Sequence, residues 1–167
     1  MSSTSTETMS QATSSSGSQA AGDGKPAARK KLTLAILSLS AFVIFLDGTV
    51  VNTALPSIAR DFSANNSVLQ WVVNMYSLIL AGFLLLAGSV GDRFGRKRAL
   101  TVGMVIFGVA SVGAALSTGS TSLIAMRGLQ GFGAAFALPS TLSIITDVFP
   151  REERAKAIAT WTAVGSL

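Results

Sequence analysis

Four long apolar runs constrain the fold of this chain more than any other feature. They occupy residues 32–59, 62–91, 99–126 and 128–146, and together they contain one charged side chain, Asp47. Because about 20 helical residues cross the roughly 30 Å of hydrocarbon in a bilayer, each run is long enough to cross once. The sequence therefore predicts an all-α integral membrane bundle, with spans at about residues 34–54, 70–91, 99–117 and 122–146.

A shorter apolar piece begins at Ala157 and continues to Leu167. At ~1.5 Å per residue it would reach about 16 Å, which is roughly half of the hydrocarbon thickness. We therefore expect it to begin a fifth span, so that residues 32–167 form an incomplete N-terminal transmembrane domain.

Residues 1–31 differ in composition from the rest of the chain. Twelve of the first 18 residues are serine or threonine, and Gly22, Gly24 and Pro26 follow. Such a segment has too few apolar side chains to offset the entropy that is lost on ordering. We expect a disordered tail here.

Composition excludes several classes of function. Charged residues make up 13% of the sequence, against roughly 25% in soluble domains. Cysteine and histidine are both absent from the sequence, which excludes disulfides, thiolate or imidazole metal sites and nucleophiles activated by a histidine base. No motif for a metal, a cofactor or an enzymatic nucleophile is visible, so we expect none of these and no enzymatic activity. The cations behind the net charge of +5 flank apolar runs, so we expect no nucleic acid partner.

The number of lysines and arginines alternates from one connecting segment to the next. The tail carries four, the connection after the first run carries one, and the later connections carry four, none and three. Because cytoplasmic segments are enriched in these residues, the tail and the connections near Arg96 and Arg154 should face the cytoplasm. This predicts a multi-pass plasma membrane protein with a cytoplasmic N-terminus. Trp71 and Tyr76, at the beginning of the second span, are then expected at the outer interface.

The connection at residues 88–98 reads Gly-Ser-Val-Gly-Asp-Arg-Phe-Gly-Arg-Lys-Arg. A tight cytoplasmic turn needs glycine and cations, which accounts for Gly91, Gly95 and residues 96–98. It does not account for Asp92, because a carboxylate is unfavourable at the negative C-terminal end of a helix. We therefore expect Asp92 to have a partner.

Two charged side chains lie inside the predicted spans, Asp47 in the first and Arg127 in the fourth. Counting residues puts each of them roughly 8–9 Å from the outer end of its span. Valine and isoleucine surround Asp47 on its own helix face, so Asp47 pairs across helices, takes up a proton or snorkels to the outer interface. We expect Asp47 and Arg127 to face each other, or the same hydrated cavity, and protonation there to be coupled to substrate movement.

Small residues follow Arg127 in the fourth span. Gly131 and Ala135 form a small-xxx-small pair, which lets a second helix approach closely, and Gln130 shares the helical side of Arg127. Packing is the expected role of Gly131, Gly133 and Ala135.

Three motifs give the chain a resemblance to a known family. Residues 88–98 resemble the Gly-x-x-x-Asp-Arg-x-Gly-Arg-Lys signature between spans two and three of the major facilitator superfamily. Residues 127–135, which read Arg-Gly-Leu-Gln-Gly-Phe-Gly-Ala-Ala, resemble a motif of its proton-coupled exporters. Residues 46–56, which read Leu-Asp-Gly-Thr-Val-Val-Asn-Thr-Ala-Leu-Pro, are similar to the first-span motif of its fourteen-span drug:proton antiporter branch. The resemblance covers nearly everything from residue 32 onward.

The resemblance implies a role for each matching residue. Asp92 matches the loop carboxylate that holds the cytoplasmic side closed against the other half of the transporter, and the rest of that gating loop is matched by Gly88, Arg93, Gly95, Arg96 and Lys97. Arg127 matches the span-four arginine associated with proton coupling, and Asp47 matches the span-one acidic residue of the fourteen-span branch. The coupling motif around Arg127 continues through Gln130, Gly131 and Gly133.

Members of this family use two six-span halves, and this branch has two additional spans. This chain supplies about a third of that full set of spans. We therefore expect the incomplete N-terminal portion of a proton-coupled exporter of drugs or metabolites. Its partners would be the lipid bilayer, protons, a small lipophilic or amphipathic substrate and the C-terminal spans of the same transporter. Two alternatives stay open: a short membrane protein with an assembly or regulatory role, and a facilitator of sugars or organic acids that ignores the proton gradient.

Overall fold

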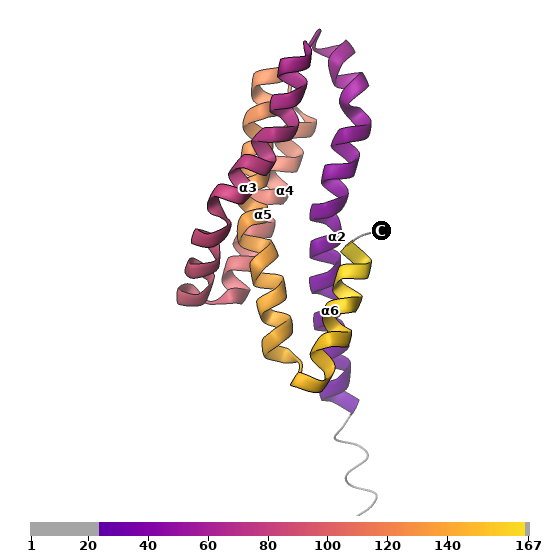
Figure 1. Cartoon of the computed structure of the whole chain (residues 1–167), viewed down its shortest axis with the longest axis vertical. Coiled ribbons are helices and arrows are strands. Elements are labelled where there is room, and N and C mark those ends of the chain that lie inside the picture. The colour runs from indigo at the N-terminus through magenta and orange to yellow at the C-terminus, as the bar shows by residue number, and fades with distance from the viewer. Residues whose placement is uncertain (1–23, 166–167) are drawn as a thin grey trace, which may run out of the picture. The chain divides into compact units, whose positions relative to one another are not determined.

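Five helices make up the described part of the chain, residues 24–165 of a computed structural model (Figure 1). They are α2 (Gly24–Asp61), α3 (Asn66–Phe94), α4 (Arg96–Ala115), α5 (Ser120–Val148) and α6 (Arg151–Gly165). Within these residues there is no strand. Helices α2 to α5 are long and apolar enough to cross a membrane. The predicted all-α membrane bundle is therefore confirmed.

Helix α2 begins inside the segment that the sequence predicts to be a disordered tail. Residues 1–23 of that tail lie outside the described residues, but residues 24–31 are helical, contrary to the prediction. Pro26 is in the first turn, where its missing N–H removes no intrahelical hydrogen bond. The following Ala-Ala-Arg-Lys-Lys consists of strong helix formers. The chain divides into two compact units, residues 1–35 and residues 36–167. Helix α2 has residues in both units.

The charged connection at residues 88–98 is much shorter than predicted. Gly95 alone separates α3 from α4, because residues 88–94 still belong to α3 and residues 96–98 already belong to α4. Gly95 has a φ of +102°, a conformation that other residues adopt only with strain. Its N–H donates to the carbonyl of Gly91 at 3.0 Å, and its carbonyl accepts from the N–H of Ala99 at 3.1 Å. A single residue therefore joins two helices.

Two other helix ends have local causes. Asn65 precedes α3 and accepts a hydrogen bond from the N–H of Val68 through Oδ1 at 3.0 Å, which satisfies one free donor of the first turn. Helix α5 ends at Val148, because Pro150 holds Phe149 in an extended conformation. These signals fix where α3 begins and where α5 ends.

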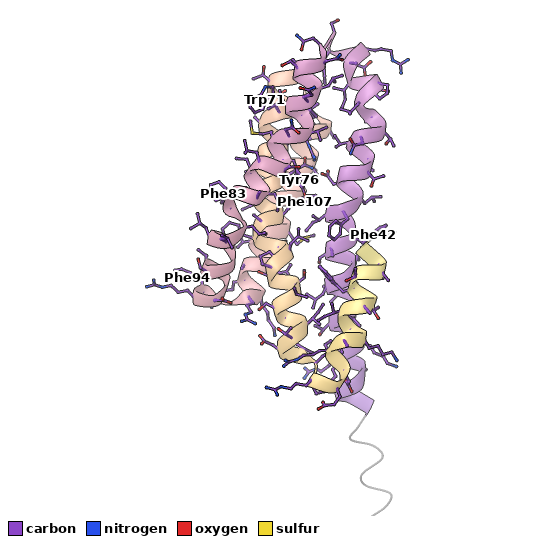
Figure 2. All side chains as sticks on the ribbon, viewed as in Figure 1. Phe42, Trp71, Tyr76, Phe83, Phe94 and Phe107 are labelled. Carbon is purple, nitrogen blue, oxygen red and sulfur yellow. The ribbon has the colours of Figure 1, made fainter. Side chains whose placement is uncertain are left out.

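Helix α5 is the centre of the group formed by residues 36–165. It has twelve buried residues, whereas α3 has three and α4 has four. Both α3 and α4 pack along it (Figure 1). The core contains Ile44, Phe107, Ala134 and Ala137, with Tyr76 packed against them. Figure 2 shows Tyr76 and Phe107 in the middle of this group.

Helix α6 follows α5 and contacts α2. The rings of Phe45 and Trp161 meet edge to face, with centroids 6.4 Å apart. The predicted fifth span begins at Ala157, but α6 itself begins at Arg151, because Glu152 and Glu153 favour the positive end of a helix. Where the bilayer boundaries fall along all these helices stays a prediction.

Many large apolar side chains point away from the core. Leu85 is 85% exposed and Leu116 is 75% exposed, and residues of the same kind recur along α2, α3 and α4. In water such a surface would favour aggregation, whereas lipid tails solvate it. The outer surface therefore suits a bilayer.

Candidate functional site

Arg127 and Asp47 form an ion pair between α5 and α2. Arg127 Nη1 donates to Asp47 Oδ2. The Arg127 side chain is 2% exposed and the Asp47 side chain is 15% exposed, so both charges are shielded from solvent. The predicted contact between these two residues is confirmed, while their role in proton coupling stays a prediction.

Gln130 joins the ion pair from the next turn of α5. Its Oε1 accepts from Arg127 Nη1 at 2.8 Å, and its Nε2 donates to Asp47 Oδ1 at 2.9 Å. Nε2 also donates to Ser111 Oγ on α4 at 2.9 Å. The amide therefore uses both donors and its oxygen, and it links three helices in one buried network.

Two residues of α3 also contact the guanidinium of Arg127. Arg127 Nε donates to the carbonyl of Val72 at 3.2 Å. The centre of the guanidinium lies 4.5 Å from the centroid of the Tyr76 ring, which is a cation–π contact. Tyr76 is partly buried and packs against the core cluster, whereas Trp71 on the same helix is half-exposed. The placement of both residues at the outer interface stays a prediction.

The small residues of α5 lie where neighbouring helices approach most closely. A Cβ at Gly131 would collide with the carbonyl oxygen of Tyr76 on α3. A Cβ at Gly133 would come within 2.7 Å of the carbonyl oxygen of Gly103 and of the nitrogen of Phe107 on α4. Real Cβ atoms do not tolerate such distances from backbone atoms, so glycine permits the close approach of both helices. This geometry agrees with the predicted packing role.

At the other end of α3, Arg96 connects the one-residue turn to α5. Its Nε donates to Asp92 Oδ1 at 3.2 Å, and its Nη1 donates to Asp147 Oδ2 at 3.0 Å. Nη1 also donates to the carbonyl of Ser143 at 3.2 Å. The expected partner of Asp92 is therefore Arg96, which lies four positions later on the other side of Gly95.

The remaining residues of the predicted gating loop surround this cluster. Gly88 and Asp92 line a pocket of about 170 Å³ together with Arg96 and Pro139. Lys97 lines an adjoining pocket of about 550 Å³ that also includes Gly95 and Asp147, and Arg93 lies 5.9 Å above the ring of Phe94. The cluster is partly open, since Asp92 and Asp147 are 66% and 64% exposed.

The comparisons with known proteins agree with this architecture. Residues 37–167 match the family profile of the Major Facilitator Superfamily. The chain belongs to this superfamily.

Several curated relatives share this part of the sequence. The multidrug resistance protein Stp of Mycobacterium tuberculosis (strain CDC 1551 / Oshkosh) is 40% identical over 137 residues, which cover 81% of this chain and 26% of Stp. The methyl viologen resistance protein SmvA of Salmonella typhimurium (strain 14028s) is 41% identical over 139 residues, covering 83% of this chain and 28% of SmvA. The multidrug efflux pump LfrA of Mycolicibacterium smegmatis is 41% identical over 136 residues, covering 81% of this chain and 27% of LfrA. The chain thus spans 26–28% of the length of these relatives.

The sequence did not identify three side chains that belong to the network around Arg127 or to the cluster around Arg96. Ser111 and Tyr76 belong to the network around Arg127, and Asp147 belongs to the cluster around Arg96. Ser111 had one visible signal, since it is the one polar side chain between Thr101 and Ser117. Asp147 had another, since it is a carboxylate at the C-terminal end of a helix, where it needs a cation.

Proposed function

We propose that this chain is the N-terminal part of a proton-coupled exporter of small lipophilic or amphipathic compounds. In this proposal it lies in the plasma membrane with its N-terminus in the cytoplasm, in line with the alternation of lysine and arginine along the sequence. The observation that carries the proposal is the buried network of Asp47, Arg127 and Gln130.

Charged groups are costly inside a membrane, and they are retained there chiefly where they act on ions, protons or substrates. Packing alone would be served as well by apolar side chains of similar volume, which often stabilise a protein as much as a buried ion pair does. A carboxylate and a guanidinium in the interior of four potential spans therefore favour a transport role over a structural one.

The hydrogen bonds around Asp47 discriminate between its two protonation states. Both hydrogen-bonding neighbours of its carboxyl oxygens donate: Arg127 to Oδ2 and Gln130 to Oδ1. A protonated carboxyl would carry an O–H that needs an acceptor, whereas the atom of Gln130 that faces Asp47 is the donor Nε2. In our proposal, proton uptake breaks this arrangement and releases α2 from α4 and α5. The coupling then consists of a change in helix contacts that depends on the proton.

The cluster around Arg96 supports a second part of the proposal. Because Arg96 ties Asp92 to Asp147 and to the backbone of α5, the cytoplasmic ends of α3, α4 and α5 can move as one body. We propose that this body, with the exposed Asp92 and Lys97, closes the cytoplasmic side against the C-terminal spans of the same transporter. The relatives whose names refer to drug resistance or efflux support the substrate class.

The test is dye efflux from bacterial cells that express the complete open reading frame encoding this chain. Efflux should stop when a protonophore collapses the proton gradient, and Asp47→Asn and Arg127→Gln should each abolish it at unchanged protein levels. Asp61→Asn is the matched control, because Asp61 is an exposed carboxylate on the same helix, and it should leave efflux unchanged.

Three results would contradict the proposal. Full efflux by Asp47→Asn would remove the coupling role of the network. Transport that continues without a proton gradient would favour a facilitator. The absence of transport for every compound tested, with the protein correctly inserted, would favour an assembly or regulatory role.

A further inference from the structure

Ser111 has a hydrogen-bonding pattern that its helix does not require. Its Oγ donates to the carbonyl of Phe107 at 2.9 Å, one turn back on α4. The same oxygen accepts from Gln130 Nε2 at 2.9 Å. A serine hydroxyl has one proton, and here that proton is committed to the backbone. Ser111 therefore presents lone pairs alone to the Gln130 amide.

The Gln130 amide has two orientations, which exchange its oxygen and its nitrogen. In the structure the oxygen faces the guanidinium of Arg127, and the nitrogen faces both Asp47 and Ser111. The reversed amide would bring its oxygen against a carboxylate and against the lone pairs of Ser111. It would also turn its N–H groups toward the donors of Arg127. The acceptor at Ser111 therefore acts together with Asp47 and Arg127 to hold the orientation in which Gln130 donates to Asp47.

We propose that Ser111 is a positioning residue for proton uptake: it holds the Gln130 amide so that this amide stabilises the ionised form of Asp47. The inference rests on the proposed function and adds α4 to the coupling apparatus. Of the described groups, the charged and titratable ones that face Asp47 are Arg127 on α5 and Tyr76 on α3. Ser111 acts on Asp47 through Gln130 and does not touch it.

Ser117 is a matched control for a purely structural serine. Its Oγ donates to the carbonyl of Gly113 at 2.9 Å, which is the same one-turn bond that Ser111 makes to Phe107. Both serines are partly buried, but among the described residues the Gln130 amide contacts Ser111 and not Ser117. Ser117→Ala therefore removes the local bond without removing an acceptor from the network.

The experiment is an infrared pH titration of the purified protein, produced from its complete open reading frame. The carbonyl band of protonated Asp47 is assigned by its absence in Asp47→Asn. In Ser111→Ala the amide keeps its bonds to Arg127 and Asp47 but loses its contact with α4. Its bond to the carboxylate is then held less firmly, so the carbonyl band of protonated Asp47 should appear at a higher pH than in the unmodified protein. Ser111→Thr, which keeps the hydroxyl, and Ser117→Ala should both titrate as the unmodified protein does.

Ser111→Cys keeps the test decisive if Ser111→Ala does not accumulate in the membrane. A thiol is a weak acceptor, so this variant should shift the band in the same direction. The inference is overturned if Ser111→Ala and Ser111→Cys titrate as the unmodified protein does. It is also overturned if Ser117→Ala shifts the band as far as Ser111→Ala.

Efflux measurements on the same variants separate this inference from the proposed function. If Asp47→Asn transports normally while Ser111→Ala still shifts the band, the positioning role stands and proton coupling is refuted. If Asp47→Asn is inactive and Ser111→Ala leaves both the band and the external-pH profile of efflux unchanged, proton coupling stands and the positioning role is refuted.

Discussion

Removal of both charges of the buried pair should destabilise the protein far less than the sum of the two single removals. Asp47→Ala leaves the guanidinium of Arg127 without its carboxylate at 2% exposure. Such a loss costs about 3–5 kcal/mol. The low end applies, about 3 kcal/mol, because Val72, Gln130 and the Tyr76 ring still contact the guanidinium.

Arg127→Met should cost less, about 2 kcal/mol, because the Asp47 carboxyl keeps the Gln130 donor and can take up a proton. The double variant leaves no unpaired charge, so it should cost about 2 kcal/mol in place of the roughly 5 kcal/mol expected from addition. The coupling energy is then about 3 kcal/mol.

The assay is reversible unfolding of the protein from its complete open reading frame in mixed detergent micelles, followed by tryptophan fluorescence. Arg60→Met and Asp61→Ala form the control cycle, since both side chains are exposed at the end of α2 and should add to within about 0.5 kcal/mol. If the Asp47 and Arg127 variants also add, the two charges do not stabilise each other and the reasoning is refuted.

Three further predictions concern the helix contacts. Gly95→Ala should lower the free energy of unfolding by about 1–3 kcal/mol, because its φ of +102° strains any side chain; a neutral result in the same unfolding assay would contradict this. Gly133→Ala should cost about 1–3 kcal/mol and weaken efflux by separating α4 from α5, since its Cβ would meet backbone atoms at 2.7 Å. Gly108→Ala, with nothing within 4 Å of its Cβ, is the control for both and should be neutral or stabilising. Arg96→Met should change the free energy of unfolding by less than about 1 kcal/mol, because its partner Asp147 is largely exposed, yet it should abolish efflux if the cluster gates the cytoplasmic side; normal efflux would remove that role.

The sequence was sufficient to predict the membrane bundle, because the length of an apolar run is a direct measure of whether a helix can cross. It also predicted the contact of Asp47 with Arg127, since two opposite charges at similar depth in a bilayer have few other partners. It could not identify Ser111 or Tyr76 as neighbours of Arg127. That depends on how α3 and α4 are rotated about their axes, which the lengths of their apolar runs do not determine.

The charged connection shows a different limit. Glycines and cations at residues 88–98 indicate a turn, but they do not tell how many residues leave the helix. The answer, Gly95 alone, depends on hydrogen bonds across the junction and on the position of Arg96 between two carboxylates. The partner Asp147 lies about 50 residues further along the chain, beyond the reach of local pattern reasoning.

The one-residue junction at Gly95 also determines which kinds of genetic change this segment can accept. Ser111 lies on α4, the continuous helix that begins directly after Gly95, so the direction of its side chain is set by the number of residues between the two. Inserting or deleting one residue between them would rotate Ser111 by about 100° around α4 and move it by ~1.5 Å along the axis, away from Gln130. Many substitutions along α4 preserve that count, whereas a single-codon insertion or deletion does not. We therefore expect length to be more strictly constrained than identity in this stretch of the gene.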